Sequence, residues 1–410
     1  EWLGEVPSHW EISSLGKILL SVSEKNRPDL PLLSITRELG VIERDTEDQD
    51  SNHNFIPDDL SNYKILKKGQ FGMNKMKAWQ GSYGVSNFTG IVSPAYYIFD
   101  FIKYINPQFF HWAIRSKIYV SFFSSASDGV RIGQWDLSKS RMKSIPFIIP
   151  SNDEQQKIAQ FLDDKTAKID QAVDLAEKQI ALLKEHKQIL IQNAVTRGLN
   201  PDVPLKDSGV EWIGQVPEYW EVKKMKFLFK DTSIKNKPDA TLLSVTQNRG
   251  VIPRNWLEER TVMPSGNLET FKFIQKDDFA ISLRSFEGGL EICHHDGIIS
   301  PAYTVLKYDK KFLNNGYYKY LFKCQKFISE MQTSIVGIRE GKNISYEELK
   351  YSFLPIPQII EQQKIAQFLD EKTAKIDQAI ALKTAHIEKL KEYKSVLIND
   401  VVTGKVQVSV

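Results

Sequence analysis

Apolar and polar positions follow their most regular pattern in two long segments, residues 154–197 and 361–402. In the first, apolar or small side chains recur at steps of three and four, at Ile158, Leu162, Ile169, Ala172, Ala176, Ile180, Leu183 and Leu190. In the second they fall at Ile365, Leu369, Ile376, Ala379, Ile387, Leu390, Leu397 and Val401. This spacing predicts two long helices with heptad character. We expect Asn152 to cap the first helix, Gln155 to complete a capping box, and Gly198 to end the helix.

Shorter elements are predicted before each long helix. Strand-like runs separated by glycine-containing turns lie at Leu32–Thr36, Ile91–Val92 and Tyr96–Phe99, and again at Leu242–Thr246, Ile298–Ile299 and Tyr303–Leu306. Amphipathic helices are expected at Phe109–Phe123 and Tyr317–Met331, and short strands at Ile145–Ile149 and Phe353–Ile356. Each half of the chain is therefore expected to hold a mixed domain followed by a long helix.

The two halves are copies of one unit. The copied segments are Glu1–Pro7 with Glu211–Pro217, Ser93–Tyr96 with Ser300–Tyr303, and Glu154–Ala172 with Glu361–Ala379. The last pair differs only at Asp164, which is Glu371 in the second copy. Segments 41–92 and 251–299, in contrast, diverge strongly. One part of the unit thus keeps a shared role, and another part differs between the copies.

The length of the helices suggests how they pack. A helix over residues 154–197 would be roughly 66 Å long, which no small domain can cover. We therefore expect an α+β fold in which two α/β-mixed domains are separated by an antiparallel pair of long helices with pseudo-two-fold symmetry. The expected regions are the domains 1–150 and 201–357, the first helix within 151–200, and the second helix with a C-terminal tail within 358–410.

Composition narrows the class of protein only a little. The 410 residues carry a formal net charge of +3, which neither requires nor excludes a nucleic-acid partner. Two cysteines, Cys293 and Cys324, fit no disulfide framework or zinc motif, so a reducing, cytoplasmic location is expected. No apolar run approaches the roughly 20 residues of a membrane span, so no membrane partner is expected. The sequence starts without Met and inside a repeat copy, so we expect an N-terminal segment to be missing.

Three motifs together resemble the specificity subunits of type I restriction-modification systems. They are the opening E-W-L/I-G-x-V-P-x-x-W, the strand I/V-S-P-A-Y, and the helix E-Q-Q-K-I-A-x-F-L-D-x-K-T-x-K-I-D, each present twice. The resemblance implies two target-recognition domains, each reading one half of a split double-stranded DNA sequence. It also implies that the long helices dock two methyltransferase subunits, to which restriction subunits add. The chain itself would hold no cofactor, since S-adenosylmethionine, ATP and Mg²⁺ would bind only in the partner subunits.

Candidate DNA-binding residues lie in the divergent segment before S-P-A-Y. They are Lys75, Lys77, Trp79, Gln80 and Ser82 in the first copy, and Arg284, Ser285, Phe286 and Glu287 in the second. A cation can meet a phosphate or guanine, glutamine can pair with adenine, and glutamate can accept from cytosine. The alternative is a surface loop whose aromatic ring packs on the core, which we favour for Trp79 and Phe286.

A second candidate is a small-residue turn that presents one arginine. It occurs at Asp128–Arg131 and, with one residue of slippage, at Val336–Arg339. Arg131 and Arg339 would suit a phosphate or a guanine edge, while the alternative for both is an ion pair with a carboxylate. Lys139 and Lys342 are further phosphate candidates.

Nothing in the sequence indicates catalysis. Cys293–Asp296 lacks metal-ligand spacing, so no metal site is expected. Asn106–Phe109 lacks the second proline of an adenine methyltransferase motif, and no glycine-lysine nucleotide loop is present. We therefore expect a non-catalytic subunit that recognises an asymmetric bipartite DNA target and positions methyltransferase and restriction subunits. The alternatives are a self-contained DNA-modifying enzyme and a coiled-coil adaptor that binds only proteins.

Overall fold

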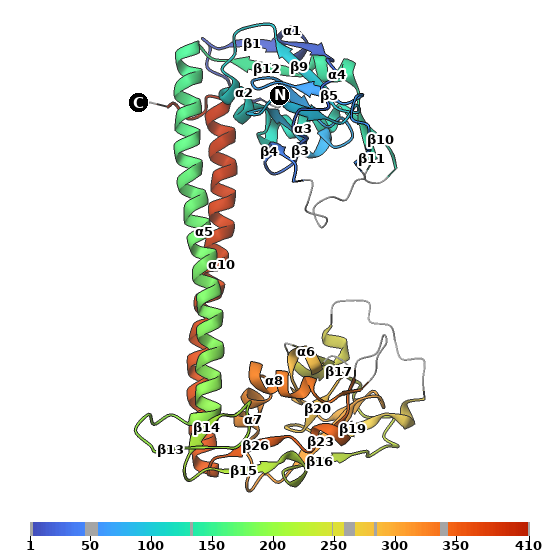
Figure 1. The fold of residues 1–410 in the computed structure, drawn as a ribbon, viewed down its shortest axis with the longest axis vertical. Coiled ribbons are helices and arrows are strands. Elements are labelled where there is room, and N and C mark those ends of the chain that lie inside the picture. Colours follow the sequence, from blue (N-terminus) through green and yellow to red (C-terminus); the bar gives the residue numbers. More distant parts are fainter. Residues whose placement is uncertain are drawn as a thin grey trace. The chain divides into compact units, whose positions relative to one another are not determined.

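The computed structural model describes residues 3–45, 56–131, 134–247, 249–257, 267–282, 285–336 and 343–408. The chain divides into two compact units, the first made of Glu1–Glu177 with Ala385–Val410 and the second of Lys178–Thr384 (Figure 1). Each unit holds one mixed α+β domain and a part of both long helices, which confirms the expected fold class. This division cuts through the helices, so the four consecutive regions drawn from the sequence stay a prediction.

A four-stranded antiparallel sheet organises the first unit. Its order is β2 (Leu19–Val22), β9 (Tyr97–Phe101), β6 (Phe71–Met73) and β7 (Tyr83–Val85). Strand pairs beside it are β1 (Glu11–Ser14) with β12 (Pro146–Ile149), β3 (Leu33–Thr36) with β4 (Gly40–Glu43), β5 (Lys64–Leu66) with β8 (Gly90–Val92), and β10 (Ser127–Arg131) with β11 (Gln134–Leu137). The helices are α1 (Leu15–Ile18), α2 (Pro107–Ile114), α3 (Lys117–Ser125), α4 (Lys139–Ser144) and the 3-10 turn η1 (Ala78–Gln80).

The second unit repeats this plan. Its sheet runs β16 (Phe229–Thr232), β23 (Thr304–Tyr308), β20 (Phe279–Ile281) and β21 (Glu291–Ile292). Its strand pairs are β13 (Leu205–Asp207) with β14 (Gln215–Pro217), β15 (Glu221–Lys224) with β26 (Phe353–Ile356), β17 (Leu243–Thr246) with β18 (Gly250–Pro253), β19 (Lys272–Ile274) with β22 (Gly297–Ile299), and β24 (Ile335–Val336) with β25 (Asn343–Ile344). Its helices are α6 (Ser285–Gly288), α7 (Asn315–Leu321), α8 (Gln325–Gln332) and α9 (Tyr346–Leu349), with 3-10 turns η2 (Met225–Phe227), η3 (Arg254–Trp256) and η4 (Leu268–Thr270).

Large aromatic side chains fill both domain cores. In the first unit the rings of Phe71, Phe110 and Phe147 are fully buried and meet edge-on or tilted. In the second unit Phe229 and Phe279 lie in the same sheet and pack edge-on with ring centroids 6.0 Å apart. Burial of these rings supplies the apolar driving force that holds the sheet against the helices beside it.

The expectation of one helix at Phe109–Phe123 and one at Tyr317–Met331 is wrong, because each segment forms two helices. The breaks fall at Ser116 (φ −65°, ψ 154°) and Cys324 (φ −73°, ψ 141°), where the backbone is extended. The residues just before the breaks, Arg115 and Lys323, send their side chains to other elements. Each first helix therefore ends at a residue with extended backbone, although the local apolar pattern continues past it.

The long helices are α5 (Asn152–Arg197) and α10 (Ile359–Val402), close to the predicted bounds. The expected cap is shifted by one residue: Ser151 Oγ accepts from the Glu154 backbone N–H, and Glu154 accepts from the Ser151 N–H, which makes Ser151 and Glu154 the capping box. Gln155 instead donates to Pro150 O and accepts from the Asn106 N–H.

Glu154 also accepts a hydrogen bond from the Trp10 indole, as Glu361 does from Trp220 in the second unit. The strand and turn that open each copy are therefore tied to the start of its long helix. At the other end of α5, Gly198 takes the left-handed conformation (φ +74°), as expected for a residue that ends a helix.

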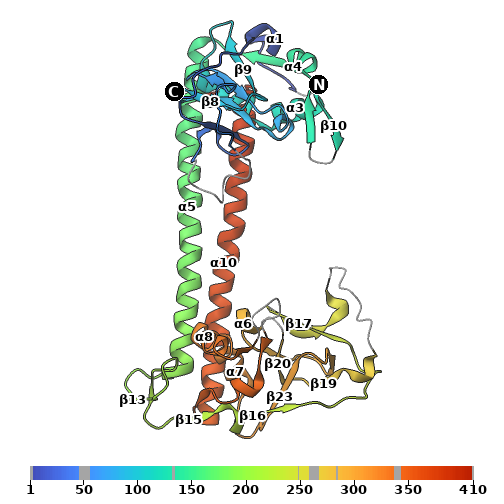
Figure 2. The same cartoon turned by 45° about the vertical axis from the view of Figure 1, so that its right-hand side comes forward.

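Within each unit the two long helices lie side by side and antiparallel (Figures 1 and 2). In the first unit Lys394 Nζ donates to Asp170 and in the second Lys187 Nζ donates to Asp377, at 2.6 Å each. These two ion pairs join residues at the same positions of the repeat, 207 apart. Buried apolar residues from both helices join each domain core, with Leu162 and Val401 in the first unit and Val195 and Leu369 in the second. The same docking of helix on helix is thus built twice.

Candidate nucleic-acid interface

The two candidate segments of the first domain, predicted separately, form one surface. The Trp79 ring of η1 stacks on the Trp135 ring of β11, with centroids 5.4 Å apart and planes 27° apart. Nearby, Lys75 Nζ lies 3.3 Å from Asp136 Oδ2 of the same strand. The hairpin β10–β11 therefore supports the segment that carries Lys75 and Trp79. Arg131 ends β10, and its side chain lies outside the described residues.

The remaining candidates of the first domain differ in their access to solvent. Lys77 is exposed and Gln80 is half-buried, so both are available to a ligand. Lys139 is held in place, since its Nζ donates to Ser21 Oγ at 2.9 Å and lies over the Tyr97 ring. Ser82 is only 2 % exposed, so its side chain is enclosed by the domain in this structure, and its role as a DNA contact stays a prediction.

The second domain presents a different set of side chains at the matching place. Ser285 is 1 % exposed and its Oγ accepts from the Ser282 N–H, so its side chain is buried here, and its role as a DNA contact stays a prediction. Glu287 is exposed and accepts from Gln247 Nε2 at 3.1 Å. Phe286 is half-buried against the core, as favoured from the sequence, and its carbonyl accepts from Gln332 Nε2. Arg284, Arg339 and Lys342 lie outside the described residues.

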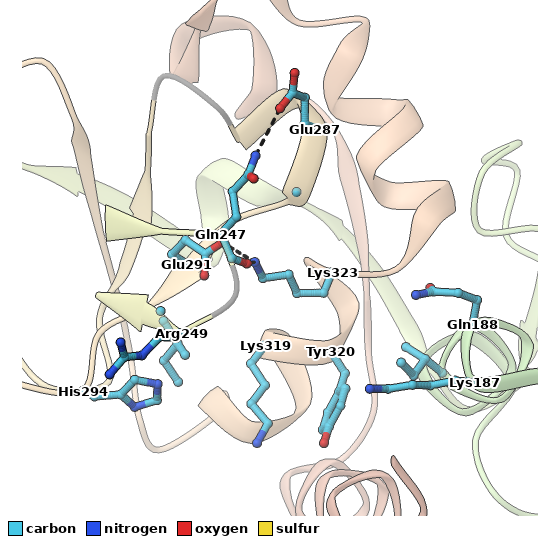
Figure 3. Close-up of a pocket in the computed structure, with 14 residues that line it drawn as sticks. Lys187, Gln188, Gln247, Arg249, Glu287, Glu291, His294, Lys319, Tyr320 and Lys323 are labelled. Atoms are coloured by element: carbon cyan, nitrogen blue, oxygen red, sulfur yellow. Dashed lines mark hydrogen bonds and ion pairs between the residues drawn. The ribbon is translucent and has the colours of Figure 1, made fainter. Parts of the chain in front are cut away.

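A cleft of about 790 Å³ opens beside this segment, between α5 and the domain of the second unit. Figure 3 shows Lys187 and Gln188 of α5 on one side, Gln247 and Arg249 of the β17–β18 turn on the other, and Lys323 between them. The cleft carries both signs of charge, because its wall also contains carboxylates. A polyanion could bind in this cleft only to cations that already pair in part with groups of the protein.

Glu291 is the most perturbed of those carboxylates. Its side chain is 4 % exposed and forms an ion pair with Lys323. Burial raises the pKa of Glu291 to about 7, although the Lys323 ammonium opposes the rise. Lys323 also donates to the backbone carbonyl of Gln247, at 2.9 Å. The protonation of Glu291 is therefore linked to the residue that holds the β17–β18 turn.

The first unit has a smaller cleft of about 180 Å³ at the matching place, between α10 and its domain. It is lined by Arg115, Lys117, Lys391 and Lys394, together with Ser116, Ser395 and Ile398. Lys394 and Ser395 of α10 stand 207 positions after Lys187 and Gln188 of α5. Lys391 and Lys394 were not among the residues predicted from the sequence, because a helix from the other half of the chain brings them to the domain. The signal was present as a lysine at the same repeat position of both long helices.

The described part of the chain offers no alternative chemical centre of the kinds considered above. No group of three or more His, Cys, Asp or Glu side chains among the described residues is placed to hold a metal ion. Cys293 is buried and its Sγ donates to the carbonyl of His295, while burial raises the pKa of the Cys293 thiol to about 12. Of the helices that the structure describes, none combines the length and apolar character needed to cross a membrane.

Comparison with known proteins identifies the class of protein. Residues 78–184 match the family model described as the type I restriction modification DNA specificity domain. Two curated proteins of Methanocaldococcus jannaschii are similar. The putative type I restriction enzyme MjaX specificity subunit is 23 % identical, with 99 % of this chain and 96 % of that protein covered. The type I restriction enzyme MjaVIII specificity subunit is 26 % identical, with 71 % and 69 % covered.

Solved structures show the same fold. A chain from a study of assembly and conformational transition in the type I R-M system has a TM-score of 0.71 at 13 % identity, with 98 % of this chain and 100 % of that chain covered. The HsdS subunit from Thermoanaerobacter tengcongensis has a TM-score of 0.59 at 14 % identity, with 98 % of both chains covered.

Fold and family model together define a protein that selects DNA by sequence. More specifically, this chain is similar over nearly its whole length to specificity subunits of type I restriction-modification systems, which confirms the resemblance seen in its sequence. Its part is recognition, and catalysis lies in other subunits of such a system.

Proposed function

We propose that this subunit reads an asymmetric, bipartite target in double-stranded DNA, with one half of the target bound by each domain. The proposal rests on one observation: the two units share the same strands but present different side chains at the matching place. In both units a divergent segment follows the same strand of the four-stranded sheet. It presents Lys77 and Gln80 in the first unit, but Glu287 in the second. Since these side chains suit different bases, the two half-sites should differ in sequence.

The matched clefts would supply contacts that do not depend on sequence. Lys391 and Lys394 in the first unit and Lys187 in the second lie on helices that face their domains. Lysines placed in this way can contact phosphates and fix the register of the duplex, while the divergent segments select its bases. Lys139 is a further phosphate contact in this proposal.

The long helices would dock two methyltransferase subunits, to which restriction subunits add. Support comes from large apolar side chains that stay exposed on these helices at equivalent repeat positions. Leu175 and Val396 are 58 % and 48 % exposed in the first unit, and Leu382 and Ile189 are 65 % and 51 % exposed in the second. Two equivalent apolar positions per unit fit two copies of one partner. S-adenosylmethionine, ATP and Mg²⁺ would be bound by the partners and no cofactor by this chain, and its cytoplasmic location stays a prediction.

The test is methylation by the full chain assembled with its methyltransferase partner. Sequencing of the modified bases in genomic DNA should give a split motif with a fixed gap and two different halves. Lys77→Ala should reduce selectivity in one half only, and Glu287→Ala in the other only, each by about tenfold or more. Lys67→Ala is the matched control, because Lys67 lies in the same domain but pairs with Glu24. A continuous or symmetric motif would contradict the proposal.

The two alternatives predict other outcomes. A self-contained modifying enzyme would transfer methyl groups from S-adenosylmethionine without any partner, which the same assay detects on the purified chain alone. A protein-only adaptor would assemble with the methyltransferase but give no sequence preference. A separate pair of variants tests the docking: Leu175→Asp with Val396→Asp should remove one of two methyltransferase copies, as measured by native mass spectrometry.

A further inference from the structure

A tight turn closed by the same two threonine hydrogen bonds occurs in each domain. It joins β3 to β4 in the first unit and β17 to β18 in the second. Thr36 Oγ1 donates to Gly40 O and accepts from the Leu39 N–H, and Thr246 Oγ1 does the same with Gly250 O and the Arg249 N–H. Both glycines take positive φ, +73° and +72°. Both turns are therefore closed in the same way, by a threonine side chain and a glycine with positive φ.

The side chains at the tips of these turns do not match. The first tip presents Arg37 and Leu39, of which Leu39 is 68 % exposed although it is a large apolar residue. The second presents Gln247 and Arg249, both exposed, at the same repeat positions. Asn248, between them, lies outside the described residues. A constant frame with divergent exposed side chains is the arrangement expected of a recognition element and not of a structural turn.

A cation from the helix break holds each turn. In the first unit the Arg115 guanidinium donates to the carbonyls of Arg37, Glu38 and Tyr83, at 2.8, 2.7 and 2.7 Å. It thus ties the turn to the start of β7, directly after the candidate segment with Lys77. In the second unit Lys323, which also precedes the helix break, donates to the carbonyl of Gln247. Both cations donate to backbone carbonyls of the turn, so they can fix its position whatever side chains the tip carries.

The turns are also joined to the candidate segments. Gln247 donates to Glu287 at 3.1 Å, which fixes the orientation of the Gln247 amide beside the cleft (Figure 3). In the first unit the close approach occurs at Gly40: an added Cβ there would lie 3.2 Å from both Arg115 and His111. In the second unit the tip therefore contacts the segment directly, whereas in the first unit the two are linked through Arg115, which also donates to the Tyr83 carbonyl.

We propose that the tips of these two turns, Arg37 with Leu39 and Gln247 with Arg249, read bases of the two half-sites, and that Arg115 and Lys323 are positioning residues for them. The inference rests on the proposed function and extends it to residues outside the divergent segments. Arginine suits guanine, Leu39 suits the methyl group of thymine, and Gln247 suits adenine. The two tips thus differ in the base pairs that they favour.

The experiment uses the full chain in complex with its methyltransferase partner and a library of duplexes randomised at each half-site. Arg37→Ala with Leu39→Ala should lower base preference about tenfold at one or two positions of one half and leave the other half unchanged. Gln247→Ala with Arg249→Ala should lower base preference in the other half and leave the first half unchanged. Lys67→Ala and Lys310→Ala are controls. Both lysines are surface residues, and their acidic partners, Glu24 and Asp277, do not belong to the tips.

Arg115→Met and Arg115→Lys test the positioning role. The methionine variant should relax the same positions as the Arg37 and Leu39 double variant, and lysine should restore part of the preference. If Arg115→Met does not fold, the double variants decide alone. A wild-type complex without a split preference would overturn the proposed function. A wild-type split preference that both double variants leave intact would overturn this inference while the proposed function stands.

Discussion

Replacing Glu291 by glutamine should remove a pH dependence of stability from the second unit. The Glu291 carboxylate is buried on β21, and burial raises its pKa from an ordinary value of 4.5 to about 7. Because the pKa is higher in the folded than in the unfolded chain, the folded state retains a proton that the unfolded state has lost. The stability from this group is fully present below pH 4.5 and is lost as the pH rises through 7.

The size of the effect follows from the same two pKa values. Each pH unit between them changes the free energy of unfolding by about 1.4 kcal/mol, so the whole effect is roughly 3 kcal/mol. Glutamine keeps the shape of the side chain and an oxygen that can accept from Lys323, but it does not titrate. The Glu291→Gln variant should therefore have nearly constant stability over this range, apart from contributions of other groups.

Amide hydrogen exchange measures the pH dependence of local stability. It does not require the two units to unfold in a single transition. The free energy of opening of β20 and β23 should fall by about 3 kcal/mol between pH 4.5 and pH 7 in the wild type, and by far less in Glu291→Gln. Glu287→Gln is the matched control, because Glu287 is an exposed carboxylate of the same cleft. Opening free energies that rise with pH in the wild type, or that respond alike in wild type and Glu291→Gln, would refute the reasoning.

Three further changes test the scaffold of each unit. Burial opposes ionisation of Glu154, but hydrogen bonds from neighbouring side chains lower its pKa to about 2. Glu154→Gln should therefore lower the free energy of unfolding by about 1 kcal/mol at neutral pH, as measured by urea unfolding, and identical midpoints would contradict this. Gly198→Ala should destabilise the end of α5 by about 1 kcal/mol, because φ is +74° and a Cβ would lie 3.0 Å from Glu361. Hydrogen exchange of the last helical turn measures this effect, and unchanged exchange there would contradict it. Trp135→Ala should cost about 1 kcal/mol and shift the fluorescence of Trp79 to the red, since its stacking partner is lost; a spectrum like the wild type would exclude the stack.

The long helices were predictable because their signals are local and repeated. Apolar steps of three and four, an almost unchanged copy and a closing glycine gave bounds within two residues for both. The pattern misplaced the cap by one residue, since Asn152 and Ser151 are both good capping residues and only the bond between Ser151 and Glu154 separates them.

The candidate site was less predictable, because access to a side chain is decided by distant neighbours. Lys77 and Glu287 were chosen from a divergent segment and are exposed, whereas Ser82 and Ser285, adjacent to other candidates, are buried. The role of Arg115 had no local signal at all: its partners in the turn lie 78 and 77 residues away.

The discontinuity of the first unit has a consequence for synthesis on the ribosome. The second unit is one uninterrupted stretch, Lys178–Thr384, so it can close its core while translation continues. The first unit cannot, because Leu397, Val401 and Val402 of α10 belong to its buried core. The domain made first is thus completed last, and until then Ile158 and Leu162 of α5 lack their apolar cover from α10. A chain truncated just before residue 385 would hold the whole second unit and a first unit that lacks its cover from α10.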